Sequence, residues 1–135
     1  MTYDVKQIEG LGDVYGERLA RQEINTTEDL LNKAGTKAGR QQLAAATDIP
    51  ESLILTWVNH ADLMRINGVA GEYSELLEAA GVDSVKELAM RNPENLHAKL
   101  MEVNIQFGLT GKVPSAQSLA QMIDEAKKLE QKVFH

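Results

Sequence analysis

The sequence contains no cysteine among its 135 residues. Neither a disulfide framework nor a metal site with thiolate ligands can form, and an enzyme with a cysteine nucleophile is excluded. The cysteine count leaves no mark of an oxidising compartment, so the cytoplasm is the expected location.

Aromatic residues are scarce, with one Trp, three Tyr and two Phe, whereas 43% of all residues are hydrophobic. Aliphatic side chains must therefore fill most of the interior. No segment has the roughly 20 apolar residues that a membrane-spanning helix needs, and residues 1–6 lack the basic and apolar stretches of a signal peptide. We expect a soluble protein that neither spans nor contacts a membrane.

Basic residues are also in deficit, because 14 Lys and Arg stand against 20 Asp and Glu, for a net charge of −6. This balance repels a polyanion and supplies no general attraction to nucleic acid or anionic lipid. Any binding to nucleic acid must therefore depend on a local arrangement of residues.

Familiar catalytic motifs are missing as well. The sequence has no Gly-x-Ser-x-Gly, no phosphate loop ending in Gly-Lys-Ser/Thr and no His-Glu-x-x-His. The histidines His60, His97 and His135 do not form a paired metal-ligand motif. We expect neither catalysis nor a bound metal or cofactor. Trp57 and His60 are the candidates for a ligand pocket, or His60 for an axial ligand, against the simpler interpretation of a hydrogen-bonded histidine.

The sequence resembles itself when shifted by 58 residues. The segment Ile8-Glu-Gly-Leu-Gly12 aligns with Ile66-Asn-Gly-Val-Ala70. Farther on, Thr26 aligns with Ser84, and both residues are placed to act as N-caps. Because the turn signals stay in register, we interpret the pattern as an internal duplication.

Glycine, proline and N-cap residues predict helices along the whole chain. The predicted helices include 13–22, 36–47, 50–66, 71–80, one from Pro93 to Gly108 and one that follows Ser115. The helix at 50–66 carries a wide apolar stripe and is expected to be central and buried. The last helix is expected to dock on the core through Leu119, Met122 and Ile123.

The stretch from Ile8 to Gly12, followed by Gly16 and Leu19, resembles the helix-hairpin-helix motif. From Ile8 to Lys127 the sequence also resembles a bacterial family of uncharacterised function built on duplicated units of this kind. The resemblance implies an all-α fold with two pseudo-symmetric helix-hairpin-helix repeats packed with additional helices around one core. As one unit over 1–135, it would comprise repeat one at about 3–34, connecting helices at about 36–61, repeat two at about 62–91 and C-terminal helices at about 92–132.

The resemblance also implies a way to hold DNA, because hairpin N–H groups at the start of a helix can bind a phosphate. The backbone candidates are Gly10, Leu11, Gly12, Gly68, Val69 and Ala70. The basic side chains that would assist are Lys6, Arg18, Arg21 and Arg65. Asp13 and Glu72, in the first helical turns, oppose an anion, and Ala70 stands where the second hairpin needs a second glycine. The first hairpin is the better candidate, and a purely structural connector is the competing interpretation for both.

These observations favour a non-enzymatic interaction module that binds a macromolecule, with a protein partner ahead because of the acidic balance. Sequence-independent DNA binding through the hairpins is the second hypothesis. A small-molecule or cofactor carrier that uses Trp57 and His60 is the third. The oligomeric state and the identity of the partner stay open.

Overall fold

The computed structural model describes residues 2–135, and all regular helical or sheet structure in this range is helical, apart from an isolated β-bridge between Asp4 and Thr26. The predicted all-α class is therefore confirmed. In chain order, the elements are η1 (Val5–Gln7), α1 (Gly12–Ala20), α2 (Thr27–Ala34), α3 (Lys37–Thr47), α4 (Glu51–Leu63), α5 (Gly71–Ala79), α6 (Val85–Ala89), α7 (Pro93–Phe107) and α8 (Ala116–Lys128).

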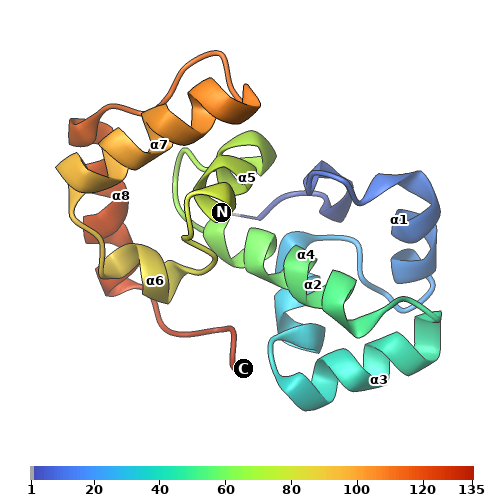
Figure 1. Ribbon diagram of the computed structural model, residues 1–135. Helices are drawn as coiled ribbons and strands as arrows, with labels where there is room; N and C mark the ends of the chain where they lie inside the picture. Colours follow the sequence, from blue (N-terminus) through green and yellow to red (C-terminus); the bar gives the residue numbers. More distant parts are fainter. Residues whose placement is uncertain (1) are drawn as a thin grey trace.

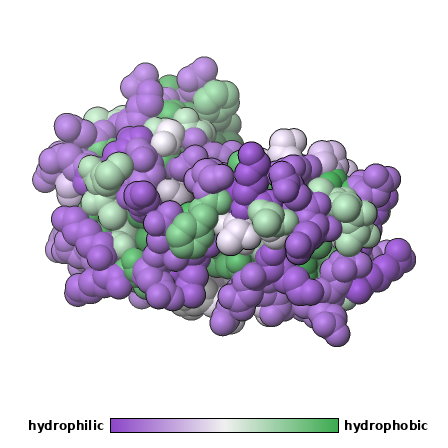
Figure 2. All heavy atoms as spheres, turned by 90° about the horizontal axis from the view of Figure 1, so that it is seen from below, coloured by the Kyte–Doolittle hydropathy of each residue, from purple (hydrophilic) through white to green (hydrophobic). Residues whose placement is uncertain are grey.

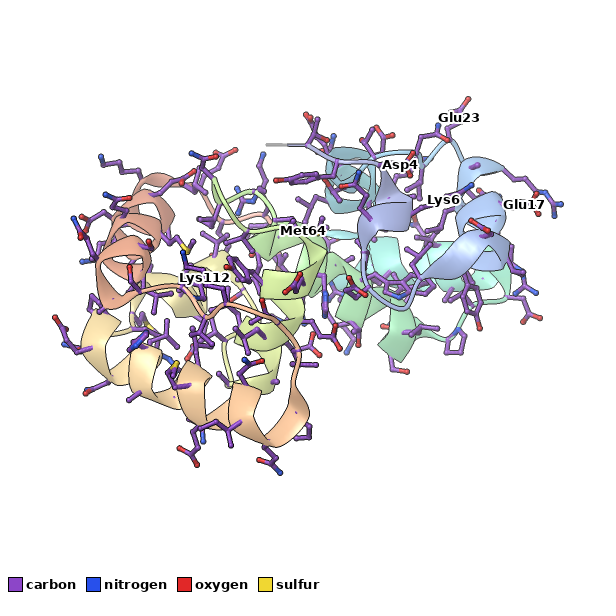
Figure 3. All side chains as sticks on the ribbon, turned by 90° about the horizontal axis from the view of Figure 1, so that it is seen from above. Asp4, Lys6, Glu17, Glu23, Met64 and Lys112 are labelled. Carbon is purple, nitrogen blue, oxygen red and sulfur yellow. The ribbon has the colours of Figure 1, made fainter. Side chains whose placement is uncertain are left out.

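The helices form two groups (Figure 1). The first lobe comprises η1 and α1 to α3, the second lobe comprises α5 to α8, and α4 runs between them. Buried apolar side chains form two clusters, where the sequence led us to expect one core. Met64 belongs to the first cluster and its neighbour Leu63 to the second. Figure 3 shows Met64 at the junction of the two groups.

The central helix α4 is buried on all sides over its second half, with Trp57 to Leu63 all buried. It ends at Leu63, three residues before the predicted end at Ile66. The last turn tightens there, because Arg65 N–H bonds to Asp62 O and Ile66 N–H bonds to Leu63 O. These i to i−3 bonds close the helix without a glycine.

Residues 58 positions apart make the same backbone contacts in the two lobes. Leu11 N–H bonds to Ile8 O at 3.2 Å, and Val69 N–H bonds to Ile66 O at 3.1 Å. Downstream, Ile24 N–H bonds to Leu19 O, and Val82 N–H bonds to Leu77 O. The matching apolar residues of each lobe therefore enter the two clusters at corresponding points.

The predicted N-caps are confirmed at Thr26 and Ser84, whose hydroxyls each accept the backbone N–H of the third residue of the next helix. In the opposite direction, the Asp29 carboxylate accepts hydrogen bonds from the backbone N–H groups of Asn25 and Thr26. These hydrogen bonds favour the ionised form and hold the pKa of Asp29 below its ordinary value. The start of α2 is thus fixed by local polar contacts.

The last two helices pack against each other over the second cluster. Helix α8 buries Leu119, Met122 and Ile123, which confirms the docking predicted for it. Helix α7 buries Leu96, Leu100 and Val103, but Phe107, four residues after Val103, is 58% exposed. Phe107 is the last residue of α7 and lies beyond the end of the buried stripe, at the point where Gly108 turns the chain in a left-handed conformation.

Residues 129–135, here called the strap, are extended and cross from α8 to the first lobe (Figure 1). Val133 is buried in the first cluster, and Phe134 N–H bonds to Gly35 O at 2.8 Å. The buried Arg40 guanidinium donates to the carbonyl oxygens of Ala34, Gly35 and Phe134. The expectation of helix to about residue 132 was therefore wrong, because α8 ends at Lys128 and these contacts hold the following chain extended.

Replacing Val133 with Ala should lower the free energy of unfolding by about 1–2 kcal/mol, since two buried methyl groups are lost. Urea denaturation followed by circular dichroism measures this change. Phe134→Ala is the control: Phe134 is 49% exposed, and its loss should cost less than about 0.5 kcal/mol. Equal losses in the two variants would contradict the anchoring role of Val133.

Replacing Asp29 with Ala should lower the free energy of unfolding at pH 7 by up to about 1 kcal/mol, a modest value because the carboxylate is screened by solvent. The folded-state pKa of Asp29 is lowered, so its contribution is present above the ordinary value of 3.8 and is lost as the pH falls through the lowered value. Urea titrations should show that the difference in the free energy of unfolding between the wild type and Asp29→Ala is smaller at pH 3 than at pH 7. Glu28→Ala, in the same helical turn, is the control, and a difference independent of pH would refute the assignment.

Candidate functional site

The first hairpin turn is open to solvent at both of its glycines. Gly10 and Gly12 have φ angles of +82° and +74°, and a Cβ built at either position would meet no atom within 4 Å. Leu11 between them is buried, and its N–H is already bonded to Ile8 O. Two of the three predicted phosphate contacts are therefore accessible in this turn, and the third is used within the turn.

The second hairpin turn resembles the first at Gly68 and Val69 but differs at Ala70, which stands where the first turn has Gly12. Gly68 has a φ of +89°, and Val69 is buried with its N–H bonded to Ile66 O. Ala70 adopts φ −102° and ψ −171°, an extended conformation open to any residue, so the alanine causes no strain. Gly71 begins α5 instead, and a Cβ there would lie 2.5 Å from Gln7 O. The glycine at 71 thus permits close contact between the two hairpin regions.

A carboxylate of the chain already occupies the second hairpin. The Glu125 side chain from α8 accepts the Asn67 N–H, at 3.0 Å from Oε1 and 3.3 Å from Oε2. This bond puts a negative charge beside the backbone groups that a phosphate would need. The Glu125 carboxylate therefore takes the place that an external anion would need at the second hairpin.

Carboxylates also gather beside the first hairpin. A shallow cavity of about 220 Å³ is lined by Gly10 together with Glu9, Glu75, Glu78, Thr56 and His60. Three acidic side chains that line the same cavity as Gly10 repel an incoming phosphate. Glu75 and Glu78 come from the second lobe, and their approach to this hairpin cannot be inferred from local sequence spacing.

The predicted basic residues do not converge on one face. Lys6 packs over Gly16, where a Cβ would lie 2.8 Å from Lys6 Cε, and its ammonium lies 3.9 Å from Asp13. Figure 3 places Lys6 in the same region as the acidic Asp4, Glu17 and Glu23.

Two of the other predicted basic residues are engaged elsewhere. Arg18 folds over the Tyr15 ring, 5.6 Å from its centroid, whereas Arg21 is exposed at the end of α1. Arg65 turns away from the second hairpin, because it bonds to Asp62 and to Glu130 O. The four cations are thus divided among separate surroundings.

His60 lies in a buried polar cluster between α4 and α5. Its Nδ1 is 3.1 Å from Ser74 Oγ, and its Nε2 is 2.7 Å from a Glu78 carboxylate oxygen. The Ser74 hydroxyl also bonds to Gly71 O at 2.8 Å. Both ring nitrogens have protein partners, so this cluster joins the start of α5 to α4 and leaves no open ligand position on the ring.

Trp57 does not line the cavity beside His60. It is buried in the first cluster, with its ring 5.2 Å from that of Tyr15. The two residues of the predicted ligand pocket therefore face different surroundings. Across residues 2–135, no group of three or more His, Asp or Glu side chains is placed to hold a metal ion.

Sequence reasoning missed three polar residues that determine these surroundings: Arg40, Ser74 and Glu125. Arg40 holds the strap, Ser74 bonds to His60, and Glu125 closes the second hairpin. Ser74 occupies the position that corresponds to Gly16 in the alignment shifted by 58 residues. A hydroxymethyl side chain at a position where the first copy has glycine was the available signal for the His60 contact.

Comparisons with known proteins place the chain in a family without assigning it a role. A search of curated proteins and a search of solved structures found no match. No helix in the described part of the chain is long and apolar enough to cross a membrane. A family model described as a domain of unknown function, DUF4332, matches residues 9–129, and the chain belongs to that family.

Proposed function

We propose that the protein is a non-enzymatic interaction module that binds a protein partner through α7. This helix lies at the outer edge of the second lobe (Figure 1). Its outward stripe carries Met101 and Ile105, four residues apart, and Ile105 is 84% exposed. Exposed Phe107 follows at the end of the helix. Large apolar side chains grouped on one exposed helix are typical of a protein contact, and this stripe carries the proposal.

Charge around the stripe indicates the chemistry of the partner. Helical spacing places the exposed Glu94 and Ala98 on the same stripe as Met101, and the exposed Glu102 borders it. Two carboxylates thus flank an apolar centre, within a chain of net charge −6. A complementary partner presents an apolar groove edged by Lys or Arg.

We also propose that residues 3–34 and 62–91, approximately, are two copies of one helix-hairpin-helix unit. The matching turn bonds described above support this proposal, as do positive φ angles at the paired positions Gly10 and Gly68 and at Glu23 and Gly81. The bacterial source and the cytoplasmic location expected from the sequence stay part of the proposal.

DNA binding is the second candidate function, and one observation favours it: Gly10 and Gly12 of the first hairpin are exposed and unobstructed. Two observations oppose it: carboxylates line the same cavity as Gly10, and Lys6 and Arg18 make contacts with different neighbours, Gly16 and Tyr15. We therefore rank it behind protein binding.

Fluorescence anisotropy with labelled duplex and single-stranded DNA should show no binding tighter than about 100 μM at physiological salt, the weak end of non-specific affinity. The measurement is repeated at low salt, with an Arg18→Glu/Arg21→Glu variant beside the wild type. Salt-sensitive binding at micromolar protein that this variant loses would promote DNA binding over our first proposal.

Substituting Ile105 with Asp should weaken the protein complex about tenfold or more, because a buried apolar contact is replaced by a charge. Candidate partners are captured from cells of the source organism, purified, and titrated with each variant by isothermal titration calorimetry. Met101→Asp should act in the same direction.

Val14→Asp is the matched control, because Val14 is also apolar and 66% exposed but lies on α1. A purified partner that binds the Ile105 variant as tightly as the wild type would exclude α7 as its site. Loss of binding with the Val14 variant alone would move the interface to the first lobe.

A further inference from the structure

A cavity of about 360 Å³ lies between α6, the end of α8 and the strap. We call it the strap cavity. Lys86 lines it from α6, Met90 from the position directly after α6, Lys127 from α8, and Gln131 and Lys132 from the strap. Arg65, just after α4, also lines it. Its walls therefore come from segments that are distant in sequence and that only the complete fold brings together.

The cavity concentrates positive charge in a chain that is acidic as a whole. Arg65, Lys86, Lys127 and Lys132 face it, against the two carboxylates of Asp62 and Glu130. Buried Asp62 is already satisfied, because it accepts the Arg65 guanidinium and the Val85 N–H. Glu130 pairs with Lys132 at 2.6 Å. The charges of Lys86 and Lys127 stay in excess and would attract an anion.

The pKa of Glu130, at the rim of the cavity, is lowered by neighbouring positive charges. Glu130 is exposed, yet its hydrogen bond to the Lys132 ammonium and the charge of Lys132 lower its pKa from the ordinary value, and the charge of Arg65 adds to the effect. Lys132 and Arg65 thus favour a negative charge at the position of the Glu130 carboxylate. Glu130 is a competitor for that position.

The remaining walls suit the uncharged part of a small ligand. Val85, Ala89 and Leu129 provide apolar surface, and Met90 at the rim is 70% exposed. Figure 2 shows the lower face of the molecule, where apolar side chains form small patches among hydrophilic ones. The volume falls within the range of about 300–1,000 Å³ that is usual for small-molecule sites.

We propose that the strap cavity binds a small molecule that carries a phosphate group. Lys86 and Lys127 contact the phosphate from opposite sides, Gln131 donates a further hydrogen bond, and the apolar body lies against Ala89 and Met90. Phosphate suits the site because a dianion meets several cations at once. This site is separate from the α7 stripe, so either proposal can fail without the other.

Inorganic pyrophosphate is the probe, titrated into the full-length protein by isothermal titration calorimetry at fixed ionic strength. We expect saturable binding that weakens about tenfold or more in Lys86→Glu/Lys127→Glu, because two attractive charges become repulsive. Glu130→Gln should strengthen binding about threefold, since the competing carboxylate is removed. In amide NMR spectra, the ligand should shift Ser84, Lys86 and Gln131.

Lys128→Glu is the matched control, because Lys128 is an exposed lysine next to Lys127 that does not line the cavity. No saturable binding, equal weakening by Lys128→Glu, or NMR shifts at Gly10 and Gly12 instead would overturn the proposal. Pyrophosphate displaced by short single-stranded DNA at a lower concentration of phosphate groups would overturn the small-molecule source and assign the site to a nucleic-acid backbone. Circular dichroism of every variant establishes that the fold is kept.

Discussion

The fold depends on the burial of one helix from two sides. Helix α4 and the residue after it supply Ile54, Trp57 and Met64 to the first cluster and Leu63 to the second, so neither lobe has a complete core without this segment. Water is excluded around the second half of α4, and every polar group there must find a partner or remain costly. His60 and Asp62 meet this requirement through contacts with α5, Arg65 and the start of α6. The polar contacts between the lobes thus follow from the position of α4.

Local features of the fold could be predicted because their causes are local. Thr26 and Ser84 cap helices as predicted, and the last helix begins directly after Ser115, since a capping side chain needs only its own next turn. The docking face of α8 followed from helical spacing alone. The end of α4 was placed too late because the tightening after Leu63 has no proline or glycine to mark it.

Long-range contacts explain most of what could not be predicted. The strap has no helical periodicity. Its backbone is held beside Val133 by hydrogen bonds to Gly35 and Arg40, which lie about a hundred residues earlier. The candidate site shows the same limit. The turn at Gly10 was foreseen, but Glu75 and Glu78 beside it arrive from another helix. The Glu125 contact with Asn67 likewise joins segments 58 residues apart.

The strap also has a consequence for the order in which the chain can fold on the ribosome. Val133 completes the first cluster, so the N-terminal half emerges long before its last core residue is synthesised. Until then the site beside Ala34 and Gly35 stays open, and the Gly35 carbonyl oxygen lacks its contact to the strap, although Arg40 can already donate to the carbonyl oxygens of both residues. The first lobe therefore cannot complete its folding before the second lobe is synthesised. Until the strap emerges, the nascent chain exposes the apolar surface that Val133 covers in the folded protein.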